Sequence, residues 1–476
     1  MDRSELLAAG IARQAELLAS GEVSSRELTE ACLQRIEEHE PRVNAFRVVF
    51  AERARERADQ ADRQLAAGER APLLGVPVAV KDNVDVAGEL TAHGTSAFTT
   101  VAAADSAQGA KLFDAGAVLV GKTNQPELAI CGFTETEAWG ITRNPWDLDR
   151  TPGGSSGGSG AAVAALMVGA ASASDGGGSI RIPAACCGLF GLKPQRGRVS
   201  LMPDREHWYG LSAAGCLTRR VADTALWLDV VAGRVDGDAD TPPPLGSFAD
   251  AASKPPAKLR IAAAIKPPRA LLPPVLDDRV AAAFAATKEA LRGLGHEVTD
   301  HELDYGSVGN DFVPRYLGGI AEDVAAVEHP ELLESRTRGF GRLGRRVPER
   351  MLQASLRRQG EHAARINAVF GDFDLVLTPT TGEPAVEIGR WAGKGALRTL
   401  LGMARSYPYT PVWNHTGQPA ASIPAPVGAG ELPVGMTLVA PPDRDELLLA
   451  LAAQLEAETG WPDRVPAIVG AASAPN

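Results

Sequence analysis

The spacing of hydrophobic positions changes along the chain and predicts alternating helices and buried strands. In residues 4–70, Leu28, Cys32 and Ile36 recur at helical spacing after a helix start near Ser25. Short apolar runs bounded by charged, glycine or proline residues are typical of buried strands. Strands are predicted at 73–80, 116–121, 259–264, 374–379 and 435–439. Helices are predicted at 106–113, 159–168, 221–232, 277–294 and 446–456.

This alternation predicts an α/β fold with a central mixed, twisted β-sheet sandwiched by α-helices. The longest weakly polar run, residues 161–173, is rich in Ala and Gly, is too short to span a bilayer and is predicted to be a buried helix. Residues 236–256 are rich in Asp, Pro and Ser and predict a surface loop. Residues 303–370 are Arg-rich and less regular, with two amphipathic helices, and we expect them to shape the substrate site.

The composition excludes several classes of function. The 476 residues are 45% hydrophobic and 22% charged, as in an ordinary globular enzyme. A net charge of −11 argues against nucleic acid or an anionic membrane as the main partner, because such surfaces attract a positive field. The N-terminus lacks a signal-peptide pattern. The five cysteines form no Cys-x-x-Cys pair, which favours a reducing, cytoplasmic location.

Two glycine-dense loops carry the residues of greatest chemical interest. Ser155 lies in Gly153–Gly158 and Ser179 lies in Asp175–Arg181, 24 positions later (179 minus 155). Lys81 ends an apolar run upstream, where burial of its side chain is expected. Glycine lets backbone N–H groups approach a ligand closely. A nucleophile, a second hydroxyl, an amine base and a group of N–H donors are the components that acyl transfer requires.

Other interpretations of these loops fit less well. A phosphate-binding P-loop would end in Gly-Lys-Ser/Thr, and a dinucleotide fingerprint would have a small residue where Val163 stands. The pattern Gly-x-Ser-x-Gly fits a nucleophile elbow, but Asn144–Pro152 reads as turn and coil rather than as the strand an elbow needs. A flexible linker would not continue directly into a helix and a second glycine motif.

The longer pattern resembles the amidase signature family across nearly the whole chain. The segments that carry the resemblance are Gly154–Ser159, Asp175–Ala185 with Gly188–Pro194, Leu74–Asn83, Gly121–Glu127, Asn144–Trp146, Leu377–Thr380, Gly417–Ala420 and Leu432–Gly435. The resemblance implies a single domain over 1–476. Its parts would be N-terminal helices (1–70), a catalytic core (71–235), the helical elaboration at 303–370 and a return to the core at 371–470.

The resemblance also implies roles for individual residues. Ser179 is the expected nucleophile, Ser155 the bridging serine in a cis peptide, and Lys81 the base. The expected oxyanion donors are the backbone N–H groups of Gly176, Gly177, Gly178 and Ser179. Gly176 stands where the family commonly has threonine, and we expect the loop to be looser there. This variant resembles hydrolases of aryl amides, cyclic amides and carbamates.

Further residues are expected around this centre. Ser156, Asp175 and Arg181 are expected to support the two loops, with Asp175 accepting N–H bonds. The resemblance places Ile130, Cys131 and Phe133 at the border of the acyl pocket, and the aromatic residues Trp208, Tyr209 and Trp413 are further candidates for lining it. Lys122 and Lys193 are expected to be structural. No two of His93, His207 and His415 have metal-ligand spacing, so neither metal nor cofactor is expected.

The sequence therefore predicts a cofactor-free amide hydrolase that acts on a small-molecule amide or carbamate, as a monomer or homodimer. Burial of Lys81 would disfavour its charged form and make it a usable base near neutral pH. The alternative is a glutaminase-type subunit of a tRNA-dependent amidotransferase, which would need a partner protein and a pocket for a charged substrate.

Overall fold

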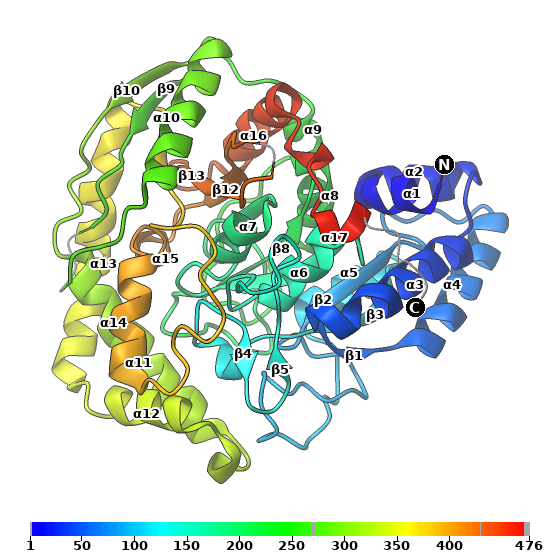
Figure 1. The fold of residues 1–476 in the computed structure, drawn as a ribbon, viewed down its shortest axis with the longest axis horizontal. Coiled ribbons are helices and arrows are strands. Elements are labelled where there is room, and N and C mark those ends of the chain that lie inside the picture. Colours follow the sequence, from blue (N-terminus) through cyan, green and yellow to red (C-terminus); the bar gives the residue numbers. More distant parts are fainter. Residues whose placement is uncertain (1, 269–271, 429, 471–476) are drawn as a thin grey trace.

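A computed structural model describes residues 2–268, 272–428 and 430–470 (Figure 1). Its strands form two mixed sheets and one short hairpin. The first sheet has the order β1-β3-β2-β6-β8, with β1 (Phe46–Val49), β2 (Pro77–Lys81), β3 (Val118–Thr123), β6 (Ala170–Asp175) and β8 (Ala213–Thr218). The second has the order β10-β9-β11-β13-β12-β7, with β7 (Gly191–Lys193), β9 (Arg260–Ala263), β10 (Glu297–Asp300), β11 (Leu375–Pro379), β12 (Ala420–Pro424) and β13 (Gly435–Val439). The hairpin is β4 (Glu135–Thr136) and β5 (Gly140–Ile141).

The two sheets meet at one backbone bridge. Phe190, just before β7, exchanges both backbone hydrogen bonds with Thr218 of β8. The single central sheet expected from the sequence is therefore two sheets joined at this point, and the mixed α/β class is confirmed. In the first sheet, β2 runs parallel to both β3 and β6. The carboxyl ends of these three strands consequently lie at one edge, which is where ligands bind in such sheets.

Helices from the first half of the chain pack around the first sheet, except for α7 (Arg181–Cys187), which packs on β7, β12 and β13 of the second sheet. α3 contacts β2 and β3, α4 contacts β3, and α6 contacts β6 and β2. Ser24 caps α3, and a capping box forms in which the Ser24 side chain accepts from the Glu27 N–H and the Glu27 side chain accepts from the Ser24 N–H. This agrees with the helix start predicted near Ser25. The helices are α1 (Arg3–Ala8), α2 (Gly10–Ser20), α3 (Ser25–Val43), α4 (Ala51–Ala66), α5 (Ala107–Asp114), α6 (Gly157–Ala164), α7 (Arg181–Cys187) and α8 (Val221–Val231), with the 3₁₀ turn η1 (Glu127–Ala129).

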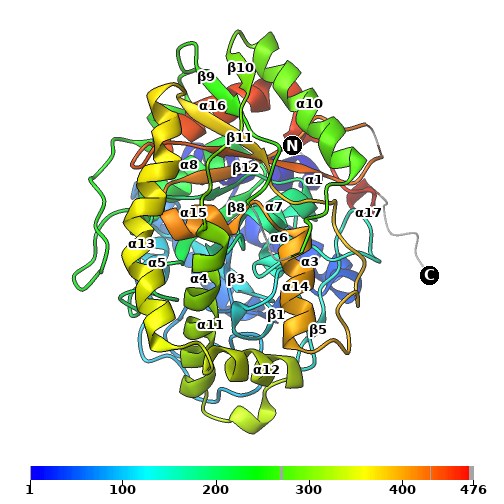
Figure 2. The same ribbon diagram turned by 90° about the vertical axis from the view of Figure 1, so that its left-hand side faces the viewer.

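Helices from the second half cover the second sheet and build a separate group beside it. α10 and α16 pack on the sheet, whereas α11, α12, α13 and α14 pack mainly on one another (Figure 2). The helices are α9 (Phe248–Ala252), α10 (Asp278–Gly293), α11 (Val308–Ala326), α12 (Ser335–Gly344), α13 (Glu349–Asn367), α14 (Ala396–Ser406), α15 (Pro411–Thr416), α16 (Asp445–Thr459) and α17 (Ala467–Gly470). The 3₁₀ turns are η2 (Pro330–Leu332), η3 (Ala368–Gly371) and η4 (Trp461–Asp463).

Three sequence predictions differ from this fold. The run 161–173 is not one helix: α6 ends at Ala164 and β6 begins at Ala170, because β6 pairs with β2 on one side and with β8 on the other, which imposes a strand on these small residues. Residues 303–370 contain three helices rather than two. A short helix, α9, interrupts the predicted loop at 236–256, where Ser247 caps it. In each case tertiary contacts decide between conformations that local sequence leaves open.

Candidate active site

Lys81 ends β2 with its side chain fully buried. Its Nζ lies 2.8 Å from Ser155 Oγ and 2.9 Å from Ser174 Oγ. Burial lowers the pKa of Lys81 to about 7, and the charge of Asp175 opposes this only in part. The neighbouring Asp82 pairs with Arg47 at 2.7 Å and with Lys122 at 3.5 Å. Lys81 is therefore not half of a surface ion pair, and its amine lies among hydroxyl groups.

Ser155 lies in the glycine-dense loop that leads into α6. The peptide bond between Gly154 and Ser155 is cis, as the family resemblance implied. Ser156 joins this loop to β6, because its hydroxyl contacts the N–H and the carbonyl of Ser174 at 3.3 Å each. A Cβ on Gly158 would lie 2.5 Å from the Ala45 carbonyl oxygen and from the Asn124 N–H. Glycine is required there because the neighbouring backbone approaches too closely for any side chain.

Ser179 is half-buried in the loop between β6 and α7. The Ser156 N–H donates to the Ser179 carbonyl at 3.4 Å, so the two serine loops adjoin. The cavity that touches Ser179 and Gly177 is about 150 Å³ in volume. Ser179 thus faces an open space, whereas Lys81 and Ser155 are buried beside it.

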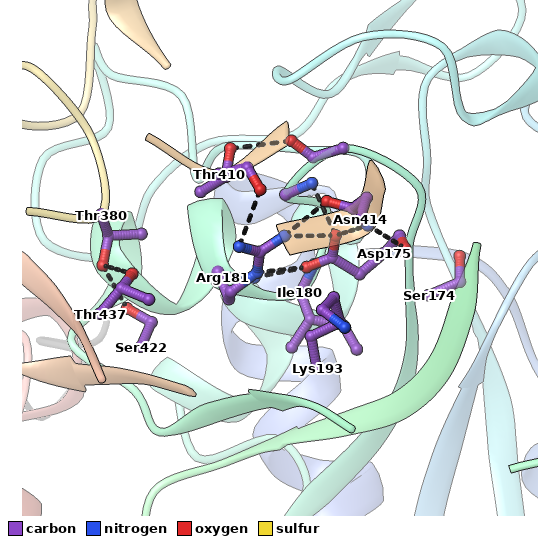
Figure 3. A network of polar contacts seen from close by, with 12 residues as sticks. Ser174, Asp175, Ile180, Arg181, Lys193, Thr380, Thr410, Asn414, Ser422 and Thr437 are labelled. Atoms are coloured by element: carbon purple, nitrogen blue, oxygen red, sulfur yellow. Dashed lines mark hydrogen bonds and ion pairs between the residues drawn. The ribbon is translucent and has the colours of Figure 1, made fainter. Parts of the chain in front are cut away.

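The carboxylate of Asp175 holds the Ser179 loop in place. Its carboxylate accepts from the N–H groups of Gly178 at 2.6 Å and Ile180 at 3.2 Å, and from Arg181 Nε at 2.9 Å (Figure 3). Burial alone would raise the pKa of Asp175, but the guanidinium of Arg181 and the amide of Asn414 hold it down at about 2. The carboxylate is therefore ionised across the physiological range and fixes the loop, as the sequence predicted.

The Gly178 amide differs from its predicted role. It is already engaged by Asp175, and its φ of +131° suits glycine alone. The amides of Gly176, Gly177 and Ser179 remain the candidate oxyanion donors. The Gly178 N–H is unavailable to an oxyanion because the carboxylate of Asp175, which holds the loop, already accepts its hydrogen bond.

Helix α15 reaches the same loop from the far end of the chain. The Asn414 side-chain amide donates to the Asp175 carbonyl at 2.7 Å and to its carboxylate at 2.8 Å. Thr410 donates to the Gly177 carbonyl at 2.8 Å and accepts from Arg181 through its own carbonyl at 3.0 Å. Sequence reasoning missed Asn414, Thr410 and Ser174. No local signal identifies the first two, but Ser174 adjoins the Asp175 motif.

The cavity beside Ser179 is apolar. None of the described residues that line it carries a charged side chain: Ala129, Ile130, Gly132, Gly177, Ser179, Ile182, Trp208, Pro268, Val308, Gly309, Phe312, Val313, Tyr316, Leu400, Met403, Ala404, Tyr407, Pro408, Pro411 and Val412. The largest contributions come from α11 and α14, and the remaining wall residues come mainly from loops. Tyr316 also donates to the Ile130 carbonyl at 2.7 Å, which ties α11 to the loop after η1.

Of the residues predicted to line the pocket, the structure places only Ile130 and Trp208 on the cavity wall. Phe133 stacks on Trp391 with ring centroids 4.7 Å apart, and the hydroxyl of Tyr209 donates to Glu322. Trp413 is fully buried against Tyr305, and the Cys131 side chain is also buried away from the wall. These four residues therefore do not line this cavity, since sequence proximity does not show which way a side chain points, and their contact with substrate stays a prediction.

The fold and this constellation define an amide hydrolase of the amidase signature type. Residues 27–449 match the Amidase family, and the chain belongs to that family. It is 45% identical to a putative amidase, AmiB2, of Mycobacterium tuberculosis (98% of this chain, 100% of that protein). It is 34% identical to the 6-aminohexanoate-cyclic-dimer hydrolase of Paenarthrobacter ureafaciens (96% of each).

Solved structures agree with this membership. A 6-aminohexanoate cyclic dimer hydrolase complexed with substrate superposes with a TM-score of 0.87 at 32% identity (97% of this chain, 99% of that chain). A bacterial aryl acylamidase of the amidase signature family gives 0.85 at 25% identity (98% and 99%). Within the described residues, no helix has the length and apolar character to cross a bilayer, and no three His, Cys, Asp or Glu side chains are grouped to hold a metal.

Proposed function

We propose that this enzyme hydrolyses the C–N bond of small-molecule amides through an acyl-enzyme on Ser179. One observation carries the proposal: the amine of Lys81 is buried, has its pKa lowered to about 7, and lies 2.8 Å from Ser155 Oγ. A lysine in water has a pKa of about 10.4 and is a poor base at neutral pH. Burial favours the neutral form of the Lys81 amine, and this amine contacts the hydroxyl of Ser155, whose loop adjoins the Ser179 loop.

The proposed steps follow from this arrangement. Neutral Lys81 takes a proton from Ser155, which takes one from Ser179 as Ser179 Oγ attacks the carbonyl carbon. The amides of Gly176, Gly177 and Ser179 stabilise the oxyanion, each by about 3 kcal/mol. Ser155 then gives its proton to the departing nitrogen and is reprotonated by Lys81. Water adds to the acyl-enzyme by the reverse route and releases the acid.

The apolar cavity supports an uncharged substrate. Two relatives are named for hydrolysing a cyclic amide dimer and an aryl acylamide, and we propose the same broad class of uncharged amides here. Carbamates fit the same acyl-enzyme route, because their carbonyl also carries a leaving nitrogen or oxygen. Helices at 303–370 contribute Val308, Phe312 and Tyr316 to the cavity, which supports their role in shaping the substrate site.

The glutaminase alternative gains no support from this cavity. Glutamine carries an α-ammonium and an α-carboxylate, and an unpaired charge in an apolar site is strongly disfavoured. None of the described residues of the cavity wall could pair with either of these charges.

The five cysteines are all buried and unpaired, which fits the proposed reducing cytoplasm.

The test is hydrolysis of anilides, aliphatic amides, aryl carbamates and glutamine by wild type, Ser179→Ala and Lys81→Ala. We expect anilide turnover that both substitutions reduce about 10⁴-fold, the scale of loss when a triad residue is changed. Turnover that persists in Ser179→Ala would sink the assignment of the nucleophile. Activity on glutamine alone would favour the amidotransferase subunit.

A further inference from the structure

The indole of Trp208 fills a socket between the Ser179 loop and helix α11. A Cβ on Gly176 would lie 2.7 Å from Trp208 Cε3, and a Cβ on Gly319 would lie 2.4 Å from Trp208 Cδ1. Real Cβ atoms do not approach other heavy atoms so closely. The indole N–H donates to Asp323 Oδ2 at 2.7 Å. The ring therefore fits only because both Gly176 and Gly319 lack a side chain.

Trp208 is held firmly in this position. Its ring packs edge-to-face on Tyr316, with centroids 5.1 Å apart, and stacks on His207 at 4.9 Å. Its backbone has a φ of +52°, which bulky residues rarely adopt and which persists only where the surroundings impose it. A rigid ring at the cavity wall sets a fixed limit on what the cavity can hold.

This arrangement explains the departure at Gly176. The family resemblance implied a threonine at that position, and from the sequence alone we expected a looser loop. In the structure Gly176 is buried under the indole, and a Cβ placed on it would lie 3.2 Å from Ser212 Oγ. The space that a threonine side chain would take is occupied by Trp208.

The cavity can be assigned to one side of the scissile bond. This step rests on the proposed function, in which Ser155 protonates the leaving nitrogen. The leaving group must then lie toward Ser155, and the acyl group on the opposite side of the carbonyl. The cavity wall includes Gly177 and Ser179 but neither Ser155 nor Lys81, so it receives the acyl group.

We propose that Trp208, seated on Gly176, is the residue that restricts the acyl group to an uncharged unit of about one aromatic ring. The cavity of about 150 Å³ supports this size, because apolar cavities of about that volume hold a benzene-sized ligand. Phe312 and Tyr316 line the cavity with aromatic rings, and no described wall residue offers a charge to a carboxylate or an ammonium. Benzoyl-type amides fit, and naphthoyl-type amides do not.

The first experiment compares kcat/KM for benzoyl and 2-naphthoyl 4-nitroanilides. Trp208→Ala is expected to raise the naphthoyl-to-benzoyl ratio of kcat/KM at least about tenfold. When the aniline leaving group is varied instead, wild type and Trp208→Ala should show the same selectivity. Trp461→Ala is the matched control, since Trp461 is also buried and donates to the Arg219 carbonyl at 3.0 Å. Its loss should lower stability without changing the ratio. An unchanged ratio in Trp208→Ala overturns the proposal.

A second experiment tests the contact with Gly176 directly. Gly176→Ala should lose at least about 100-fold in kcat/KM, because its Cβ displaces the indole or the loop. Adding Trp208→Ala should recover at least tenfold of that loss. If Gly176 were needed only for loop flexibility, the double variant would be no more active than Gly176→Ala, which would overturn the proposed contact.

Binding to Ser179→Ala separates this inference from the proposed function. Calorimetry with benzamide and 2-naphthamide measures the cavity without chemistry. Tighter binding of benzamide, reversed when Trp208→Ala is added, supports the inference even if Ser179 is not the nucleophile. If Ser179→Ala and the double variant show the same ratio of benzamide to 2-naphthamide affinity, the inference is overturned, even if Ser179→Ala abolishes turnover as expected.

Discussion

The side chains of Arg181 and Asn414, 233 positions apart in the chain, meet at 2.7 Å beside the carboxylate of Asp175 (Figure 3). Both groups contact the same carboxylate oxygen, Asp175 Oδ1, at 2.9 and 2.8 Å. All three residues are buried. A short helix from the C-terminal half of the chain therefore completes the support of the loop that carries Ser179.

This contact predicts that Asn414→Ala weakens both stability and catalysis. The change removes the donor to a buried carboxylate and should lower the free energy of unfolding by about 2 kcal/mol. It also frees the Ser179 loop, so kcat should fall about 10–100-fold with little change in KM. Denaturant unfolding and steady-state kinetics measure the two effects. Asn414→Asp should be worse, because it puts a second carboxylate beside Asp175; equal or better activity would contradict this account.

The lowered pKa of Lys81 predicts the pH dependence of catalysis. The base must be neutral, so kcat/KM should rise with pH through a midpoint near 7, where Lys81 loses its proton. Lys193 provides a matched control, because burial lowers its pKa to about 7 as well, yet its Nζ donates to the Pro194 carbonyl. Lys193→Met should keep the midpoint near 7. If the midpoint moves in Lys193→Met, the pH dependence would have to be assigned to Lys193 rather than to Lys81.

The same two lysines predict how stability varies with pH. Each has a folded pKa near 7, below the value of about 10.4 in the unfolded chain, so the unfolded state binds more protons between these values. Stability should therefore rise from pH 7 to pH 10, and the cost of burying each amine is fully present below pH 7. Lys81→Met should stabilise the protein more at pH 7 than at pH 10. Denaturant titrations at both pH values check this, and an equal effect at both would contradict a lowered pKa.

Ser174 is predicted to orient the amine of Lys81. Its hydroxyl lies 2.9 Å from Lys81 Nζ and also accepts from Asn83 Nδ2 at 3.1 Å. Ser174→Ala should lower kcat/KM about tenfold and move the pH midpoint downward, because the charged amine loses an acceptor. Ser174→Thr keeps the hydroxyl and should restore most of the activity. A purely structural role for Ser174 would leave the pH midpoint in place.

Local sequence determined much of this protein. The periodicity of Leu28, Cys32 and Ile36 and the capping pattern at Ser24 place α3, since helix ends depend on side chains within a few positions. The glycine-dense loops and the lysine at the end of an apolar run indicated Lys81, Ser155 and Ser179. Their roles remain predictions, but the structure brings Lys81 to Ser155 and joins the two serine loops.

Tertiary structure decided what depends on distant segments. It turned residues 170–173 into a strand, committed the Gly178 amide to Asp175, and put Trp208 rather than Tyr209 or Trp413 on the cavity wall. It also brought Asn414 to the Ser179 loop and the indole of Trp208 onto Gly176. Side-chain direction and long-range contacts are fixed by the packing of whole elements, and no window of neighbouring residues contains that information.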